Sequence, residues 1–249
     1  MKSSLTSVTF RKKTIEEIVD LAVQAGIDAI EWGGDVHVPP TAPAAAQTAV
    51  QLCSENGIEI SAYGSYYRCS ENEDFLPVLK TALALNTRII RVWAGSLGSK
   101  MCPPETREKL NRRLSEAVAM AAEKDVIVAT EYHSNTLTDE LESALQLLTD
   151  IPGLYTYWQP SPSIPRAHGY DTYTFKQRGK RVINVHVFHQ NLKQKAPLSD
   201  GFDKWLGYFH DLKKYSAAQY AAIEFVMGDT SEQFLEDAKT LKKILSKVL

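Results

Sequence analysis

The sequence predicts an α/β fold, a single (β/α)8 TIM barrel, and three observations predict it. Short apolar runs alternate with longer amphipathic segments along the chain, which is the pattern of parallel strands joined by helices. The alternation repeats eight times within 249 residues, and barrels often use about 200–250 residues as one domain. An open doubly wound sheet, the main alternative, would ordinarily carry a glycine-rich first turn, and the sequence has no G-x-G-x-x-G motif and no P-loop. We therefore expect residues 1–249 to form one domain.

Each of the eight units is predicted to begin with a short apolar strand. In chain order, the predicted strands are residues 5–10, 27–32, 58–63, 88–93, 126–131, 154–159, 181–188 and 220–226. The helices that follow them are residues 14–26, 41–56, 74–86, 104–123, 138–148, 170–178, 202–215 and 231–248. Thr14 is expected to cap the first helix, which ends at Gly26, and Gly57 is expected to stop the second. The sixth helix has the weakest pattern and overlaps the end of a proline-rich loop over residues 161–170.

The composition excludes several classes of protein. Hydrophobic residues make up 44% of the chain and charged residues 23%, which suits a globular protein with a large core. A net charge of −2 argues against a nucleic-acid partner, which would call for a basic stripe. No apolar run is long enough for a transmembrane helix, and the first residues lack the apolar stretch of a signal peptide. Three cysteines without metal-ligand spacing predict no disulfide framework, so we expect a cytoplasmic protein.

Polar side chains end four consecutive predicted strands. Active sites of this architecture lie at the C-terminal ends of the strands. Glu131 ends the fifth strand, Gln159 the sixth and Glu224 the eighth, and His186 lies near the end of the seventh. Side chains alternate between the two faces of a strand, so the residue two positions earlier lies on the same face. If these four residues point into the barrel, the residues below them on the inward face are Ala129, Tyr157, Asn184 and Ala222.

Two carboxylates, an imidazole and an amide would be costly to bury without partners. A divalent cation accounts for all four groups at once, with Glu131, Gln159, His186 and Glu224 as ligands. Oxygen ligands with one imidazole suit Mn²⁺, our first choice, and also Mg²⁺ or Co²⁺, with Zn²⁺ as a further candidate. Taken singly, each residue has an ordinary structural explanation, such as a salt-bridged carboxylate or a hydrogen-bonded core histidine. The joint placement is what indicates a metal site.

At these residues the chain resembles the xylose-isomerase-like TIM-barrel family of sugar isomerases and epimerases, which also includes inosose dehydratases. The resemblance spans the chain and is carried by GIDAIEWGG, ATEYHSNTLTD, YWQPSP, NVHVFH and AAIEFVMGDTSEQFLED. It implies that Glu131, His186 and Glu224 bind one divalent metal and that the two glutamates transfer protons. Gln159 stands where the family usually has Asp. Barrels of this family are often dimers or tetramers, so the resemblance leaves a homo-oligomer open.

The implied activity is a metal-dependent isomerisation or epimerisation of a sugar or related keto-polyol. Glu131 and Glu224 would transfer the proton through a metal-stabilised enediolate. Two alternatives stay open. One is a dehydratase or lyase acting on a keto-sugar or cyclitol, and the other is a barrel that only binds a sugar.

Several further residues are predicted to contact the substrate. His133 follows Glu131 on the same side of its strand, and Trp93 and Tyr63 end their own strands. His37 lies in a loop above the second strand, His189 replaces an Asp that the family usually has, and His168 lies in the loop after the sixth strand. Core packing is an equal explanation for the two aromatic residues. Glu31 and Arg91 are expected to point inward as a buried ion pair.

Overall fold

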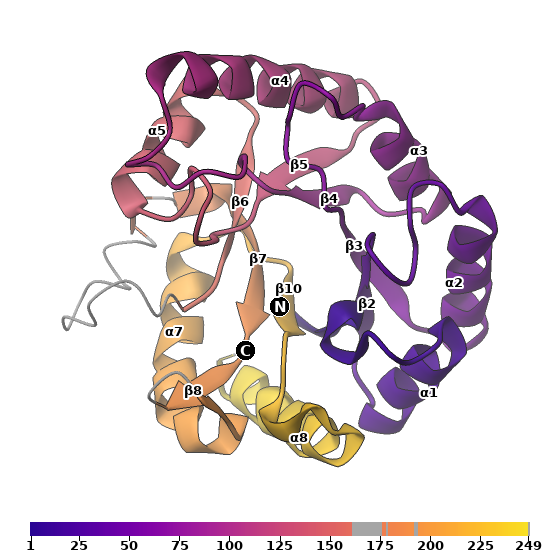
Figure 1. The fold of residues 1–249 in the computed structure, drawn as a ribbon. Helices are drawn as coiled ribbons and strands as arrows, with labels where there is room; N and C mark the ends of the chain where they lie inside the picture. The colour runs from indigo at the N-terminus through magenta and orange to yellow at the C-terminus, as the bar shows by residue number, and fades with distance from the viewer. Residues whose placement is uncertain (161–175, 178, 192–193, 249) are drawn as a thin grey trace.

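The computed structural model describes residues 1–160, 176–177, 179–191 and 194–248. Within them, eight parallel strands close into a barrel in the order β1-β10-β7-β6-β5-β4-β3-β2, which confirms the predicted fold (Figure 1). The barrel strands are β1 (Lys2–Thr6), β2 (Ala29–Gly33), β3 (Glu59–Gly64), β4 (Ile89–Val92), β5 (Ile127–Thr130), β6 (Tyr155–Trp158), β7 (Val182–Val187) and β10 (Tyr220–Ile223).

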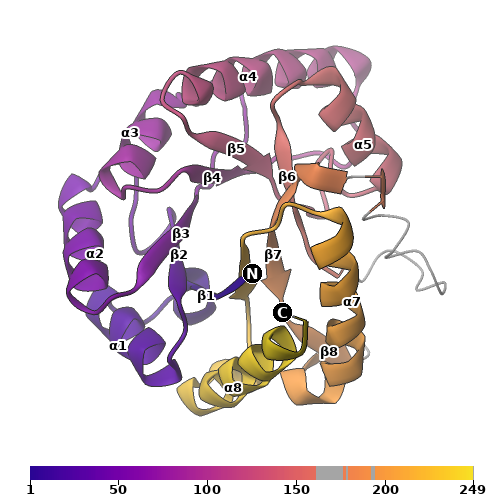
Figure 2. The same ribbon diagram turned by 180° about the vertical axis from the view of Figure 1, so that it is seen from behind.

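The helices surround the barrel on its outside, as the two end-on views show (Figures 1 and 2). They are α1 (Ile15–Ala25), α2 (Pro43–Glu55), α3 (Leu76–Ala84), α4 (Pro104–Ala122), α5 (Leu141–Asp150), α7 (Phe202–Tyr215) and α8 (Ser231–Val248). Thr14 caps α1 as predicted, in a capping box in which its hydroxyl accepts from the Glu17 amide and Glu17 accepts from the Thr14 amide. Gly26 ends this helix in the left-handed conformation at φ 59°. Most of the predicted sixth helix lies outside the described residues.

The first strand begins earlier than its apolar pattern indicates. β1 covers Lys2–Thr6, and residues 7–10 form a 3-10 turn instead of continuing the strand. Ser3 and Ser4 look like loop residues in the sequence, yet both are buried. The Ser3 hydroxyl donates to Asp28 at 2.7 Å, and the hydroxyls of Ser4 and Ser61 lie 2.9 Å apart. Because buried polar groups are tolerated when they are hydrogen-bonded, these serines can line the start of the barrel.

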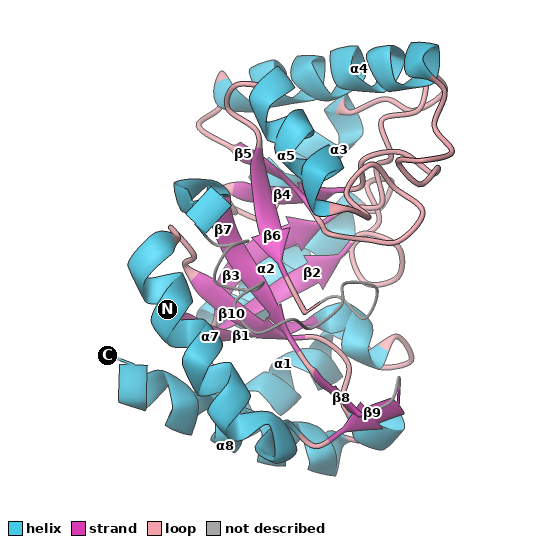
Figure 3. Ribbon diagram, turned by 90° about the vertical axis from the view of Figure 1, so that its left-hand side faces the viewer, coloured by secondary structure: helices cyan, strands magenta, loops and turns pink. Residues whose placement is uncertain are grey.

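The loop after β7 contains a feature that the sequence pattern did not predict. β8 (His189–Asn191) and β9 (Gln194–Ala196) pair antiparallel in a separate two-stranded sheet, apart from the barrel strands (Figure 3). In barrels of this kind such loops at the C-terminal ends of the strands form the walls of the active site. No helix in the described part of the chain has the length and apolar content needed to cross a membrane.

Two groups of buried apolar residues hold the barrel together. The larger group fills the layer between the strands and the surrounding helices. The smaller group lies inside the barrel and consists of Ala62, Ile89, Ala129, Tyr157 and Ile183. This small inner group closes the barrel interior below the polar residues, so that the interior is a packed core and not a pore.

Candidate active site

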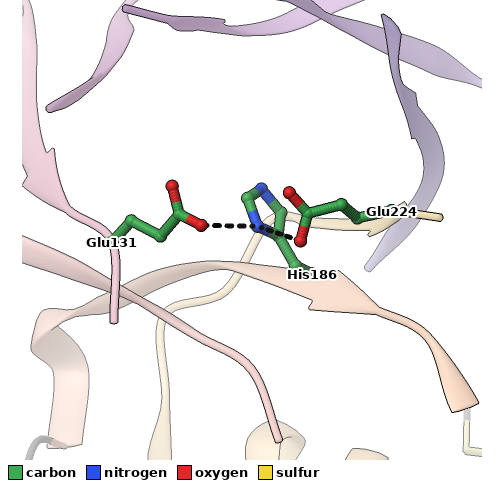
Figure 4. Close-up of side chains that lie close together, drawn as sticks. All are labelled: Glu131, His186 and Glu224. Carbon is green, nitrogen blue, oxygen red and sulfur yellow. Dashed lines mark ion pairs between the residues drawn. The ribbon is translucent and has the colours of Figure 1, made fainter. Parts of the chain in front are cut away.

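Glu131, His186 and Glu224 converge at the C-terminal end of the barrel, as predicted from the strand ends. Glu131 and Glu224 directly follow β5 and β10, and His186 lies within β7. Figure 4 shows the two carboxylates approaching the imidazole from opposite sides. His186 Nδ1 lies 3.2 Å from Glu224 Oε2 and 3.9 Å from Glu131 Oε1. All three side chains are buried, with exposed fractions of 4%, 0% and 6% in chain order.

Gln159 completes this group and is held by a second contact. Its Oε1 lies 3.0 Å from His186 Nδ1, and its amide nitrogen donates to the Tyr132 carbonyl oxygen at 2.7 Å. The carbonyl of Tyr132 can only accept, so it fixes which end of the amide faces the histidine. The side-chain oxygen of Gln159 therefore faces His186 Nδ1, as the carboxylates of Glu131 and Glu224 do.

Glu31 and Arg91 lie beside the group and form the expected ion pair. Arg91 Nε donates to Glu31 Oε1 at 2.9 Å, and Arg91 also donates through Nη1 to Glu131. His186 Nε2 lies 3.5 Å from Glu31 Oε1. Burial would raise the pKa of Glu31, but Arg91 and His186 outweigh it and lower that pKa to about 2.

The charges shift the pKa values of the central residues in different directions. Burial lowers the pKa of His186, but the carboxylates of Glu224 and Glu31 outweigh it and raise that pKa to about 10. Burial raises the pKa of Glu131, and the Arg91 guanidinium opposes this shift without reversing it. Burial also raises the pKa of Glu224, but the positive charge of His186 outweighs burial and lowers this pKa below its usual value. The two carboxyl groups therefore differ in their affinity for a proton.

This set of side chains fits a divalent cation. One ligand atom from each of Glu131, His186 and Glu224 lies within 4.8 Å of the others, and Gln159 Oε1 faces the same imidazole nitrogen. Glu31 adds a third buried carboxylate to the cluster, against Arg91 and the imidazole. A cation bound at Nδ1 would replace the proton that now balances these charges. Carboxylate and amide oxygens with one imidazole are ligands of Mg²⁺, Mn²⁺, Co²⁺ and Zn²⁺.

A cavity of about 410 Å³ opens above the cluster. Its lining includes Glu131, Gln159 and Glu224, together with Trp93 and His133 from the predicted substrate contacts. The rings of Trp93 and His133 stack at a centroid distance of 4.2 Å, and the Arg68 guanidinium lies 3.7 Å from the Trp93 ring centroid. Trp93 and His133 therefore both line the cavity, and their contact with a substrate stays a prediction.

The other predicted substrate contacts are not among the described residues that line this cavity. Tyr63 is fully buried, and its hydroxyl donates to the Val38 carbonyl. His37 is also buried, its Nε2 lies 3.1 Å from the Lys13 carbonyl oxygen, and its ring contacts Trp32. Both side chains are buried and neither lines this cavity, so their contact with a substrate stays a prediction.

Two histidines remain from the predicted contacts. His189 lies in β8, beside a smaller hollow next to the cavity, where its ring packs against Gly201. His168 lies outside the described residues.

Several residues line the cavity that the positions of the strand ends in the sequence do not predict. Arg11, Tyr66, Asp139, Phe188 and Phe225 all line it. Arg11 bonds to Asp35 and donates to the Tyr66 hydroxyl at 2.5 Å, which joins the loops after β1, β2 and β3. Phe225 has a φ of 61°, a conformation that side chains of its size rarely adopt. The alternation of side chains along the strand predicts that Phe225 faces the outer helices, opposite Glu224. That expectation is wrong, because β10 ends at Ile223 and the alternation does not extend to Phe225.

Known proteins share this arrangement of elements. A 3-dehydroshikimate dehydratase from Bacillus anthracis is 29% identical over 164 residues, which cover 61% of this chain and 58% of the relative. The match thus spans less than two thirds of the relative's length. The crystal structure of the probable 3-DHS dehydratase AsbF from Bacillus anthracis superposes with a TM-score of 0.79 at 22% identity, over 97% of this chain and 99% of that chain. The IOLI protein with a bound zinc atom gives a TM-score of 0.77 at 15% identity, over 100% and 99% of the two chains.

The model of the xylose isomerase-like TIM barrel family matches residues 19–244, which is most of the chain. The closed barrel and the polar strand ends described above agree with that match. This protein belongs to the xylose isomerase-like TIM-barrel family.

Proposed function

We propose that this protein is a divalent-metal-dependent enzyme that removes a proton next to the carbonyl of a small hydroxylated compound and then eliminates a hydroxyl group as water. The observation that carries the proposal is the convergence of Glu131, Gln159 and Glu224 on His186 Nδ1 at the floor of a cavity. The similarity to a 3-dehydroshikimate dehydratase supports elimination as the outcome.

Glu131, Gln159, His186 and Glu224 would hold the cation. When bound, a divalent cation supplies Lewis acidity that stabilises negative charge on a substrate oxygen. Mn²⁺ stays our first choice, and the zinc atom bound in the IOLI structure keeps Zn²⁺ a candidate as well.

The two glutamates divide the proton transfers between them. One carboxylate takes the proton from the carbon next to the carbonyl, and the electron pair of that bond moves onto the carbonyl oxygen. The other, as a carboxylic acid, protonates the departing β-hydroxyl, which leaves as water while a carbon–carbon double bond forms. Return of both carboxyl groups to their starting state needs only proton exchange with solvent. Their separate positions on opposite sides of His186 allow each to act on a different substrate atom (Figure 4).

Isomerisation or epimerisation is the second candidate, and the same opposed carboxylates favour it. If the second glutamate returns the proton to carbon instead of to a leaving hydroxyl, the product is an isomer or epimer of the substrate. Both activities share the first step, so one experiment tests that step and also separates the outcomes.

The experiment follows Mn²⁺-loaded protein by NMR in D₂O with a panel of keto-sugars, cyclitol ketones and cyclic hydroxy-keto acids. Loss of water with a new alkene signal supports the dehydratase, whereas deuterium at carbon without loss of water supports the isomerase or epimerase. We expect Glu224→Gln to lower the rate of either process by about 100-fold or more. Glu59→Gln, on the exposed start of β3, is the matched control and should keep wild-type turnover. Wild-type turnover and deuterium exchange in Glu224→Gln would refute the mechanism, and a panel with no reaction and no deuterium exchange would favour a barrel that only binds.

A further inference from the structure

We propose that the buried pair of Glu31 and Arg91 is a positioning device for the metal ligands, in which Glu31 orients His186 and Arg91 orients Glu131. The inference rests on the metal site of the proposed function and assigns a role to two residues that would not touch the metal. It differs from a purely structural ion pair, whose removal as a pair would leave the ligands in place.

Glu31 lies on the side of the imidazole away from the other ligands. Its Oε1 is 3.5 Å from His186 Nε2, whereas Gln159 and Glu224 face Nδ1. Within the described residues, His186 Nε2 and Glu31 Oε2 are both buried and have no hydrogen-bond partner. When Nδ1 binds a cation, the remaining proton of the neutral imidazole is on Nε2, and Glu31 is the carboxylate placed to accept it.

Arg91 connects this carboxylate to a second metal ligand. It donates through Nε to Glu31 and through Nη1 to Glu131, and its planar guanidinium fixes the angle between the two bonds. Glu31, Arg91 and Glu131 are each nearly fully buried, so solvent does not screen their interaction. A displacement of Arg91 would therefore move the carboxylate of Glu131, and a displacement of Glu31 would change the orientation of the His186 ring.

The neighbouring strand leaves room for the pair. Gly64 ends β3, which lies between β2 and β4, the strands of Glu31 and Arg91. A Cβ added at Gly64 would lie 2.7 Å from Arg91 Nη2 and 2.8 Å from Glu31 Oε1, closer than normal contacts. A single methyl group at this position would thus displace both side chains without removing a charge.

The test is Mn²⁺ affinity measured by titration calorimetry on metal-free protein, with the melting temperature of each variant as a check on folding. We expect Glu31→Gln and Gly64→Ala each to weaken Mn²⁺ binding by about 10- to 100-fold, the usual effect of losing an outer contact to a ligand. Glu59→Gln, the exposed control, should bind as the wild type does. Wild-type affinity in Glu31→Gln and Gly64→Ala would overturn the proposal.

The double variant Glu31→Leu/Arg91→Met separates positioning from simple stabilisation. Replacing a whole buried ion pair by apolar residues often preserves stability. A folded double variant with weak Mn²⁺ binding supports the proposal, and recovery of wild-type affinity overturns it.

A measurement on the wild type covers the case in which variants do not fold. In Zn²⁺-loaded protein labelled with ¹⁵N, we expect the His186 Nε2 proton to be observed and Nδ1 to bind zinc. Zinc on Nε2 would overturn the proposal. Failure of the wild type to bind any divalent cation would instead refute the metal site of the proposed function.

Discussion

The raised pKa of His186 predicts that metal binding depends steeply on pH. In the metal-free protein this pKa is about 10, so the imidazole carries two protons near neutral pH. A metal ligand must be unprotonated at the nitrogen that binds. The Nδ1 proton, which faces Gln159 and Glu224, therefore has to leave before His186 can act as a ligand.

The size of the change in apparent metal affinity follows from the difference between the pH of the measurement and the pKa of His186. As long as the pH stays below about 10, each unit of increase makes removal of the proton ten times easier. Between pH 6.5 and 8.5 the apparent affinity for Mn²⁺ should therefore rise about 100-fold, or roughly 3 kcal/mol. A histidine with an ordinary pKa near 6.5 would give only a shallow dependence that levels off above pH 7.

Calorimetry in two buffers with different enthalpies of ionisation measures the number of protons released. We expect about one proton per Mn²⁺ at pH 8, where a histidine with an ordinary pKa would release almost none. His210→Gln, on the exposed surface of α7, is the control and should leave proton release unchanged. Binding that is independent of pH over this range, with no proton released at pH 8, would refute the reasoning.

Three further predictions concern binding and stability. If Gln159 is a direct ligand, Gln159→Asp should strengthen Mn²⁺ binding in calorimetry, because it adds a negative charge; unchanged or weaker binding would exclude direct contact. The pKa of His186 is raised on folding, so its stabilising effect on the metal-free protein is complete below about pH 6.5 and is lost as the pH rises towards 10. Denaturation of metal-free protein should therefore show falling stability over that range, and a flat profile would contradict it. Because Phe225 has a φ of 61°, Phe225→Gly should be more stable than Phe225→Ala by about 1 kcal/mol in urea unfolding, whereas equal stability would show no backbone strain.

A last prediction concerns the first helix, whose start was expected from the sequence. Thr14→Ala removes the hydroxyl that accepts from the Glu17 amide and should lower the free energy of unfolding by about 1 kcal/mol. Thr14→Ser keeps this hydroxyl and is the control. Urea unfolding of both variants checks the prediction, and equal losses in both would contradict it.

The positions at the strand ends show how far local patterns determine a site. Glu131, Gln159, His186 and Glu224 were placed together from the alternation of side chains and from their order on successive strands. Both rules hold in the structure because parallel strands in a closed barrel end on the same side and in a fixed order. Trp93 and His133 reach the cavity for the same reason.

The residues on loops could not be placed in this way. His37 was a candidate for substrate contact, yet it is buried against Trp32 because the loop after β2 folds over the core. Tyr63 lies one residue before the end of β3, and its buried hydroxyl donates to the Val38 carbonyl oxygen. The direction of these side chains depends on how distant segments cover one another, and no local pattern contains that information.

The order of the barrel units and the chemical groups at the barrel mouth follow from the amino-acid sequence alone, since periodicity and strand-end residues are local properties of the chain. How those groups are held depends on contacts between distant segments, which form when the chain folds. Arg91 bonds to Glu31 and Glu131, which are 60 and 40 residues away along the chain. Gly64 leaves the space in which the pair fits. Contacts of this kind depend on the closure of the barrel, which brings β2, β3, β4 and β5 side by side around one axis.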